Sequence, residues 1–364
     1  MQRSVAPNEL GRVDAPATVP DAFEHPEGGE RSVSASWRER ASRLVRWESG
    51  LVLALAGTIS FGVSSSAQFA QSSNIFNMGL SDAVVALMAL PMTLVIISGE
   101  IDLSIASTLA LSSSLLGYLW SHHWPMPAII VTVLVVGVVL GLVNGLLVTR
   151  VGLPSLAVTI GTMTLYGGIA EIILGPTIVS NFPSTYTTIG STAFPHTPFT
   201  VSTVVFIVLA VAFAALLHFT SLGRATYAIG ANSETAAFSG IRVKRVKTVL
   251  FAVSGLIGAS AGVIYTFQLS TATYTNGTSL LLPVIAIVLV GGVSIFGGKG
   301  TLIGVILAIL VYSTLENALL LTNFPENALG MVTGGLLLVS VVVPNGKEIL
   351  SRLRMRSRLV SRTR

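Results

Sequence analysis

Two acidic residues stand close together in a strongly apolar part of the chain. Glu100 and Asp102 lie in the stretch ISGEIDLSIAS, residues 97–107, between two long apolar segments. An ionisable group in or near a membrane is costly and therefore suggests a function. Carboxylates two residues apart could bind a cation, although nothing nearby completes such a site. The alternative is a tight structural turn of Gly99, Glu100, Asp102 and Ser104, in which Asp102 or Ser104 caps the next helix.

Other polar side chains are scattered through the apolar segments. Most are hydroxyls and amides, which suit the passage of a neutral polyol better than that of an ion. They could equally form hydrogen bonds between helices, each worth well under about 2 kcal/mol. The candidate pathway residues are Asn144, Thr159, Thr162, Thr164, Tyr166, Glu316 and Asn317. The candidate charges for ion coupling are Glu100, Asp102, Glu171 and Glu316.

The glycine-rich stretch GGVSIFGGKG, residues 291–300, is not a phosphate-binding loop. The pattern G-x-x-x-x-G-K-[ST] needs glycine at 293 and Ser or Thr after Lys299, where the chain has Val293 and Gly300. The sequence contains no nucleophile triad or HExxH motif, and it contains no cysteine, which excludes disulfide and zinc-thiolate chemistry. We therefore expect no cofactor on this chain, and any ATP-driven step needs a nucleotide bound by another subunit.

The elements that must position these residues are membrane-spanning helices. Of the 364 residues, 52% are hydrophobic and only 10% are charged, whereas soluble proteins have about 25% charged residues. Apolar blocks of about 20 residues recur, and each could cross a bilayer as a helix. We expect an all-α polytopic membrane protein with about ten spans, the eighth short enough to be broken or partly re-entrant. The spans are predicted at 51–69, 77–98, 101–120, 127–149, 155–174, 201–217, 248–267, 284–298, 301–321 and 328–344.

The positive charges predict how these spans are oriented. If the N-terminus is inside, all 21 Lys and Arg residues fall on the cytoplasmic side. Both termini are then cytoplasmic, and the basic pI reflects anionic lipid rather than nucleic acid. The expected regions are a polar, partly disordered tail at 1–48, a transmembrane domain at 49–345 and a basic tail at 346–364. Residues 37–47 of the first tail could form a helix on the membrane surface or a plain basic flank.

A basic, glycine-interrupted loop at residues 218–247 lies on the cytoplasmic side. A short helix is predicted inside it. Asn232 or Ser233 can cap the first N–H groups, Glu234 suits the positive end of the helix dipole, and Gly240 suits a left-handed stop.

That short helix would present an apolar knob to solvent. Ala236, Ala237 and Phe238 would form the knob, within a collar of five cations: Arg224, Arg242, Lys244, Arg245 and Lys247. Such a knob suits docking into a groove of a soluble partner. A loop that only fixes the topology is the alternative. On the opposite face, the 175–200 connection suits either a docking surface or an ordinary interfacial loop.

Four stretches of the chain resemble the permeases of ribose-type bacterial ABC importers, which take up pentoses, hexoses, rhamnose and the autoinducer-2 signal. With the spans between them they cover about residues 50–344. They are ISGEIDLSIAS at 97–107, GLVNGLLVTRVGLPSLAVTIGTMTLYGGIA at 141–170, GRATYAIGANSETAAFSGI at 223–241 and IAIVLVGGVSIFGGKGTLIG at 285–304.

The resemblance implies a cytoplasmic coupling segment that seats in a cleft of an ATPase subunit. The matching residues are Gly223, Arg224, Tyr227, Gly230, Asn232, Glu234, Ala236, Ala237, Gly240 and Ile241. It also implies a multi-pass protein of the bacterial cytoplasmic membrane that is a transporter subunit and not an enzyme. The implied partners are a second permease subunit (a copy or a paralogue), an ABC ATPase that binds ATP and Mg²⁺, and an extracytoplasmic sugar-binding protein. The alternative function is a stand-alone secondary transporter or channel for a small polar solute.

The chain also departs from the family pattern at several positions. Glu100 stands where relatives often have glycine, and Gly167 and Gly168 stand where many have arginine after the tyrosine of the fifth span. Leu281 and Pro283 replace an acidic pair common before the eighth span. The fold expectation is unaffected, but the identity of the sugar stays open. The sequence of residues 89–104 resembles the rhamnose and autoinducer-2 branch more closely.

Overall fold

The structure is a computed structural model that describes residues 33–193, 197, 199–325, 328–340 and 342, with backbone alone at 33–46 and 189. The chain divides into two compact units, Met1–Leu44 and Val45–Arg364, and the contacts discussed below lie in the second. In the described residues every regular element is a helix. The predicted C-terminal tail and most of the predicted N-terminal tail fall outside the described residues.

Seven helices of the described part are long and apolar enough to cross a membrane. They are residues Trp47–Ser65 of α1 (Val33–Ser65), α2 (Ser72–Ile97), α4 (Met126–Leu146) with the π-helical η1 (Leu147–Val151), α5 (Ser155–Leu174), α7 (Val201–Phe219), α10 (Val243–Leu269) and α12 (Leu302–Leu321). Three shorter helices are α3 (Ile105–Ser121), α11 (Leu281–Val290) and Ala328–Ser340. The polytopic helical class is confirmed. In the described residues, seven of the ten predicted spans contain a helix long and apolar enough to cross a membrane, and the full count of ten stays a prediction.

The predicted surface helix at 37–47 is not a separate element. It is part of α1, which continues without a break from Val33 to Ser65. Residues 37–47 are therefore helical, as their pattern predicts, and their position on a membrane surface stays a prediction.

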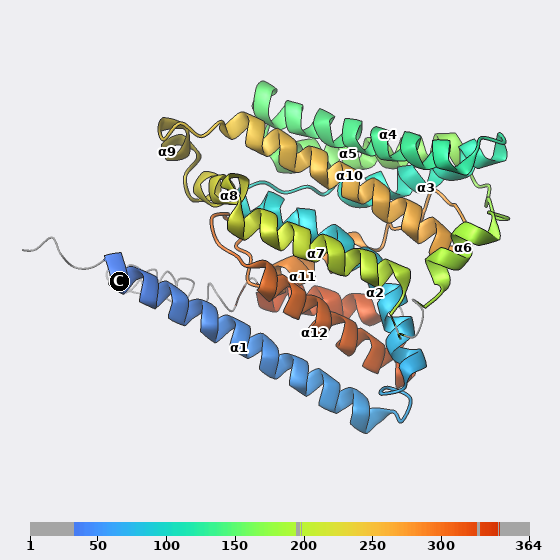
Figure 1. Cartoon of the computed structure of the whole chain (residues 1–364), viewed down its shortest axis with the longest axis horizontal. Coiled ribbons are helices and arrows are strands. Elements are labelled where there is room, and N and C mark those ends of the chain that lie inside the picture. The colour runs from blue at the N-terminus through green and yellow to red at the C-terminus, as the bar shows by residue number, and fades with distance from the viewer. Residues whose placement is uncertain (1–32, 194–196, 198, 326–327, 341, 343–364) are drawn as a thin grey trace, which may run out of the picture. The chain divides into compact units, whose positions relative to one another are not determined.

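Helix α2 is the central helix of the bundle. Every residue from Ala83 to Ser98 is buried, and its side chains form one apolar core with α7, α10, α11 and α12. By contrast, only 11% of the span in α1 is buried, which leaves most of its apolar surface for lipid. Figure 1 shows α2 passing behind α7 within the bundle.

Helices α4 and α10 pack side by side through small residues (Figure 1). Gly137, Gly141 and Gly145 recur every fourth residue along α4 and face α10. A Cβ atom added at Gly145 would lie 2.9 Å from the Cα atom of Thr248, and one added at Gly141 would overlap the carbonyl oxygen of Phe251. The two backbones are therefore in direct contact, the arrangement that small residues allow between membrane helices.

The eighth predicted span is a half-helix. Helix α11 has 10 residues, or about 15 Å of length, against a hydrocarbon thickness of about 30 Å. The segment before it, residues 270–280, is irregular, and the amide of its buried Asn276 donates to Ser113 Oγ in the middle of α3 (2.9 Å). Within this segment Ala272, Asn276 and Gly277 are buried, while Ser270, Thr275, Thr278 and Ser279 are exposed.

Candidate functional site

The loop at 218–247 folds into two short helices, α8 (Ser221–Ala231) and α9 (Ser233–Phe238). Asn232 caps α9, because its Oδ1 atom accepts the Thr235 N–H (2.9 Å). Gly240 has a left-handed φ of 83°, and the Ile241 N–H donates to the Ala236 carbonyl (3.1 Å), the pattern of a Schellman stop. The helix predicted from the sequence, with its cap and its stop, is confirmed.

The exposed surface of α9 is smaller than predicted. Phe238 is 93% exposed and Ala236 only 3% exposed, while Glu234 and Ala237 are exposed. The knob therefore consists of Ala237 and Phe238, because Ala236 faces the protein. An open depression beside it is lined by Ser233, Glu234, Ala237 and residues 242–245.

Four of the five cations predicted around the knob are exposed. They are Arg224, Arg242, Lys244 and Arg245. Lys247 instead forms an ion pair with Glu100, and the two side chains are 16% and 12% exposed. The start of α10 is thereby tied to the loop between α2 and α3.

Several predicted coupling residues face the rest of the protein. The Tyr227 hydroxyl donates to the Gly300 carbonyl (2.7 Å), and burial raises the pKa of Tyr227 to about 12, so this hydroxyl stays protonated at neutral pH. The ten motif residues divide into two sets. Those exposed to solvent are Arg224, Asn232, Glu234, Ala237 and Gly240, and those buried or half-buried are Gly223, Tyr227, Gly230, Ala236 and Ile241.

Asp102 lies inside the bundle and not at an exposed turn. It is 1% exposed, and its carboxylate accepts the Ser104 N–H (3.0 Å), the Ser104 hydroxyl (2.6 Å) and the Ser254 hydroxyl of α10 (2.6 Å). Asp102 therefore has the structural role that the turn interpretation predicts. Its carboxylate accepts the N–H of the N-cap residue Ser104, however, so neither Asp102 nor Ser104 caps α3 with its side chain. Because Glu100 binds Lys247 instead, the two carboxylates do not converge, and the interpretation as a paired cation site is wrong.

The polar network around Asp102 extends through α4 and α5. The Asn144 amide donates to Ser104 Oγ (2.7 Å), and the Tyr166 hydroxyl contacts Asn144 Oδ1 (3.4 Å). The Thr159 hydroxyl donates to the Ile101 carbonyl (3.1 Å). These candidate pathway residues are all buried, and they join helices rather than line an open channel.

Thr162 and Thr164 behave differently from one another. Thr162 is buried, and its hydroxyl donates to the Val158 carbonyl of its own helix (3.0 Å). Thr164 is exposed on the outward surface of α5. Of the predicted set on α4 and α5, Thr164 is the member that a solute or a second subunit could reach.

A second polar group joins α2 to α12. Asn74 and Asn317 exchange two amide hydrogen bonds (2.8 and 3.0 Å), and the Ser313 hydroxyl donates to Asp82. The sequence analysis missed Asp82, an acid inside the predicted second span. Its charge in an apolar segment is the signal that would have found it.

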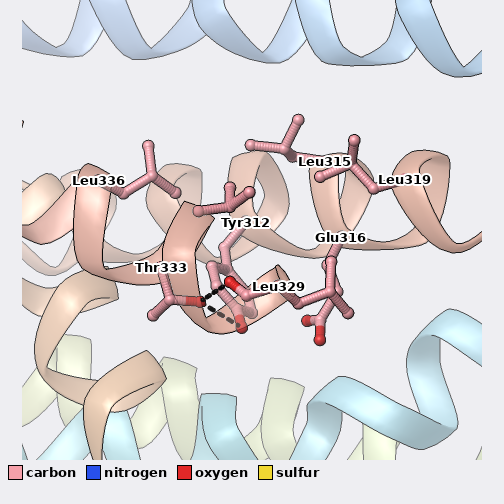
Figure 2. A pocket seen from close by; sticks show the side chains of 8 residues that line it. Tyr312, Leu315, Glu316, Leu319, Leu329, Thr333 and Leu336 are labelled. Atoms are coloured by element: carbon pink, nitrogen blue, oxygen red, sulfur yellow. Dashed lines mark hydrogen bonds between the residues drawn. The ribbon is translucent and has the colours of Figure 1, made fainter. Parts of the chain in front are cut away.

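Glu316 lies at the edge of this second group. Figure 2 shows its side chain on the same helix as Tyr312, whose hydroxyl contacts Thr333 Oγ1 (3.4 Å). The cavity that these residues line measures about 10 Å³, room for at most about one water molecule. The predicted pathway residues thus form two groups on different helices, and this cavity is too small for a sugar.

Comparisons with known proteins identify the family of the chain. Residues 74–341 match the family model of the permease component of branched-chain amino acid transport systems. Relatives include the Autoinducer 2 import system permease proteins LsrD of Yersinia enterocolitica (34% identical over 304 residues, 81% of this chain and 91% of that one) and of Photorhabdus temperata (32% over 304 residues, 81% and 90%). The same-named protein of Salmonella paratyphi B is 32% identical over 276 residues (74% and 82%).

No solved structure matches the chain significantly. The family model covers most of the chain, and the relatives are similar over nearly their whole length. The chain therefore belongs to this family of transport-system permeases and is a multi-pass protein of the bacterial cytoplasmic membrane.

Proposed function

We propose that the chain is the transmembrane subunit of an ATP-binding-cassette importer. Its cargo is a monosaccharide or sugar-like small molecule of the ribose, xylose, rhamnose or autoinducer-2 class, and a separate ATPase subunit with ATP and Mg²⁺ supplies the energy. The observation that carries the proposal is α9, a capped and stopped helix that exposes Phe238 among cations. The names of the relatives favour the autoinducer-2 end of this class.

The positions of the cations support the proposed orientation. A hydrogen bond between Thr149 and Thr248 (2.9 Å) joins η1, which contains Arg150, to the start of α10. The Gly298 N–H donates to the Ile97 carbonyl (2.8 Å), which brings the loop of Lys299 to the same end. We propose that this end is cytoplasmic, that all ten helices cross or enter the membrane, and that both termini are inside.

The chemistry of α9 indicates what its partner offers. Phe238 and Ala237 need an apolar pocket, since a fully exposed phenylalanine gains about 1.5–3 kcal/mol when it is buried. Arg242, Lys244 and Arg245 border the knob and need acidic groups around that pocket. We propose that the ATPase subunit supplies a cleft of this kind.

The outward face of α5 suits contact with a second permease subunit. Ala157, Gly161, Thr164 and Gly168 follow one another at spacings of four, three and four residues and so share one face. A Cβ atom added at Gly161 or Gly168 would meet nothing within 4 Å. Small side chains leave open space along this face, and we propose that the second subunit faces it across the solute pathway, which runs past Thr164.

The outer helix α6 (Ser184–Ser191) packs against the opposite end of α10. Tyr186 stacks on Phe267 at 5.6 Å between ring centroids, and Phe182 meets the same ring edge-on at 6.1 Å. We propose this ordered outer segment as the docking surface for the extracytoplasmic sugar-binding protein.

Charge reversal on α9 tests the coupling role. We expect Glu234→Lys and Ala237→Arg to keep the protein folded, because both side chains are exposed, and to abolish copurification with the ATPase. Ser221→Arg, an exposed site at the start of α8, is the matched control. If both α9 variants copurify with the ATPase and support ATP-dependent autoinducer-2 uptake normally, the docking role of α9 is contradicted. Sugar flux through the purified chain alone would favour the stand-alone transporter.

A further inference from the structure

Three segments that are distant in sequence meet backbone to backbone at the proposed inner end. They are α8, the loop 98–104 and the loop 291–301, and glycines form the contact. A Cβ atom added at Gly297 would lie 2.9 Å from the Cα atom of Gly99, and one added at Gly230 of α8 would overlap the carbonyl oxygen of Ile97 and the amide nitrogen of Gly298. We name Gly99, Gly230, Gly297 and Gly298 the glycine contact.

The glycines of the two loops are needed for conformation as well as for space. Gly99, Gly297 and Gly298 have φ values of 82°, 79° and 71°, in the left-handed region that glycine enters without steric cost. Gly230 is a helical residue, so its lack of a side chain serves the close approach alone.

Directional bonds hold the glycine contact together. The Gly298 N–H donates to the Ile97 carbonyl (2.8 Å), and the Tyr227 hydroxyl donates to the Gly300 carbonyl (2.7 Å). The Glu100–Lys247 ion pair connects the loop 98–104 to the first turns of α10. Helix α8 therefore cannot shift without moving both loops or breaking these bonds.

The loop 98–104 leads from the glycine contact to the centre of the bundle. Two residues beyond Glu100, the buried Asp102 binds Ser254 of α10 and, through Ser104, Asn144 of α4. A displacement of this loop must therefore reach the helices that carry most of the candidate pathway residues.

We propose that the glycine contact transmits movement of the ATPase-coupling segment to both inner loops, so that α8 and the loops 98–104 and 291–301 move as one body. Gly230 and Tyr227 are the positioning residues of this transmission. The proposal rests on the coupling role proposed above. It goes beyond that role by assigning a mechanical function to the inward-facing half of the motif.

Pairs of spin labels can test whether the three segments move together, because the chain has no cysteine of its own. Cysteines at Ser221 on α8 and at Lys299 in the loop 291–301, each paired with a reference cysteine at Ile178, would carry labels at exposed sites. In the complex with a cysteine-free ATPase, we expect both distances to Ile178 to change on ATP binding while the Ser221–Lys299 distance stays constant. A change at Ser221 without one at Lys299, or no change at either, overturns the proposal.

Gly230→Ala should break the transmission. We expect ATP hydrolysis by the complex to continue while autoinducer-2 uptake per ATP falls about tenfold, within the usual range of coupling between sites. Gly57→Ala on the exposed surface of α1, where a Cβ atom meets nothing within 4 Å, is the control and should behave as wild type. Unchanged uptake per ATP in a folded Gly230→Ala variant overturns the proposal.

Tyr227→Phe keeps the test decisive if Gly230→Ala does not fold. It removes only the hydrogen bond to Gly300, and we expect uptake per ATP to fall about threefold, as the loss of one such bond implies. A wild-type ratio in this variant would overturn the proposal. If the wild-type chain assembles with no ATPase, the proposed function fails instead, so the two failures can be told apart.

Discussion

Glu100 and Asp102 are two residues apart but have partners two helical turns apart on α10. Lys247 and Ser254 are seven residues apart, about 10 Å along the helix axis, and two extended residues span about 7 Å. The loop 98–104 therefore runs along α10 into the bundle instead of turning at its end. Glu100, a departure from the family pattern, is accommodated because Lys247 neutralises it.

Removing one member of this ion pair should leave an uncompensated, half-buried charge. We expect Lys247→Met to destabilise the protein by an amount between the roughly 1 kcal/mol of an exposed pair and the 3–5 kcal/mol of a fully buried one. Thermal unfolding of the purified protein would measure it, with the exposed Arg245→Met as control. Adding Glu100→Gln should restore part of the loss, and strictly additive effects would contradict a direct interaction.

Asp102 should respond to substitution according to the number of donors left unpaired. Asp102→Ala leaves three donors of Ser104 and Ser254 without their acceptor, and each buried unpaired group costs about 1–3 kcal/mol. Asp102→Asn keeps an acceptor oxygen, and the serine hydroxyls can rotate to accept its amide. We expect a much smaller fall in melting temperature for Asn than for Ala. Equal falls would show that the carboxylate charge itself is required.

Residue-scale prediction from the sequence succeeded where the partners are local. The cap by Asn232 and the stop at Gly240 depend on neighbours within five positions. The Glu100–Lys247 pair joins residues 147 positions apart, and no local pattern indicates such a partner. Asp82 was missed although its charge was visible in the sequence, so this omission lay in the interpretation.

At the scale of elements, composition and segment length predicted the helices of the apolar segments and the short α9, whereas α6 and α8 were not predicted. Helix α11 is short because glycines follow it at 291–292 and an irregular segment precedes it, and its length already indicated a break. The sequence did not predict that residues 37–47 and the first span form one continuous helix, since a change in polarity does not end a helix. Both cases show that hydropathy finds apolar segments better than it finds helix ends.

The packing of α4 on α10 should fail when a methyl group is added at its closest point. We expect Gly141→Ala to destabilise the protein by about 1–3 kcal/mol, the usual cost of overpacking, because the added Cβ would overlap the Phe251 carbonyl. Thermal unfolding in detergent would report it. Gly161→Ala on α5 gains helix propensity without a clash and should be neutral or stabilising. Equal stability of the two variants would mean that α4 and α10 are not in backbone contact.

At the scale of the whole molecule, the predicted pathway residues, all of which lie in the described part of the chain, do not line a shared channel. Asn144, Thr159 and Tyr166 form hydrogen bonds to other elements of the bundle. Glu316 lines a cavity of only about 10 Å³. The sequence indicates polar residues in apolar segments, but it does not indicate which of them find partners within the fold. The remaining exposed candidate, Thr164, lies where we place a second subunit.

Thiol labelling can test this placement of the pathway. We expect Thr164→Cys in the assembled complex to react with a membrane-impermeant thiol reagent, because a solute pathway contains water. Val131→Cys, exposed on the apolar surface of α4, is the control and should be protected by lipid. Protection of both positions would place the pathway elsewhere.

The same cysteine-free background permits a test of the orientation on which the coupling role depends. Thr235 on α9 is exposed at the end of the bundle where α8, the loop 291–301 and the start of α10 meet, and Ile178 is exposed on the segment between α5 and α6. In intact spheroplasts, we expect an impermeant reagent to label Ile178→Cys but not Thr235→Cys, and permeabilisation to expose the second. Labelling of Thr235→Cys from outside would put the knob on the side without ATP. A cytoplasmic ATPase could then not bind α9, and the proposed coupling role would be wrong.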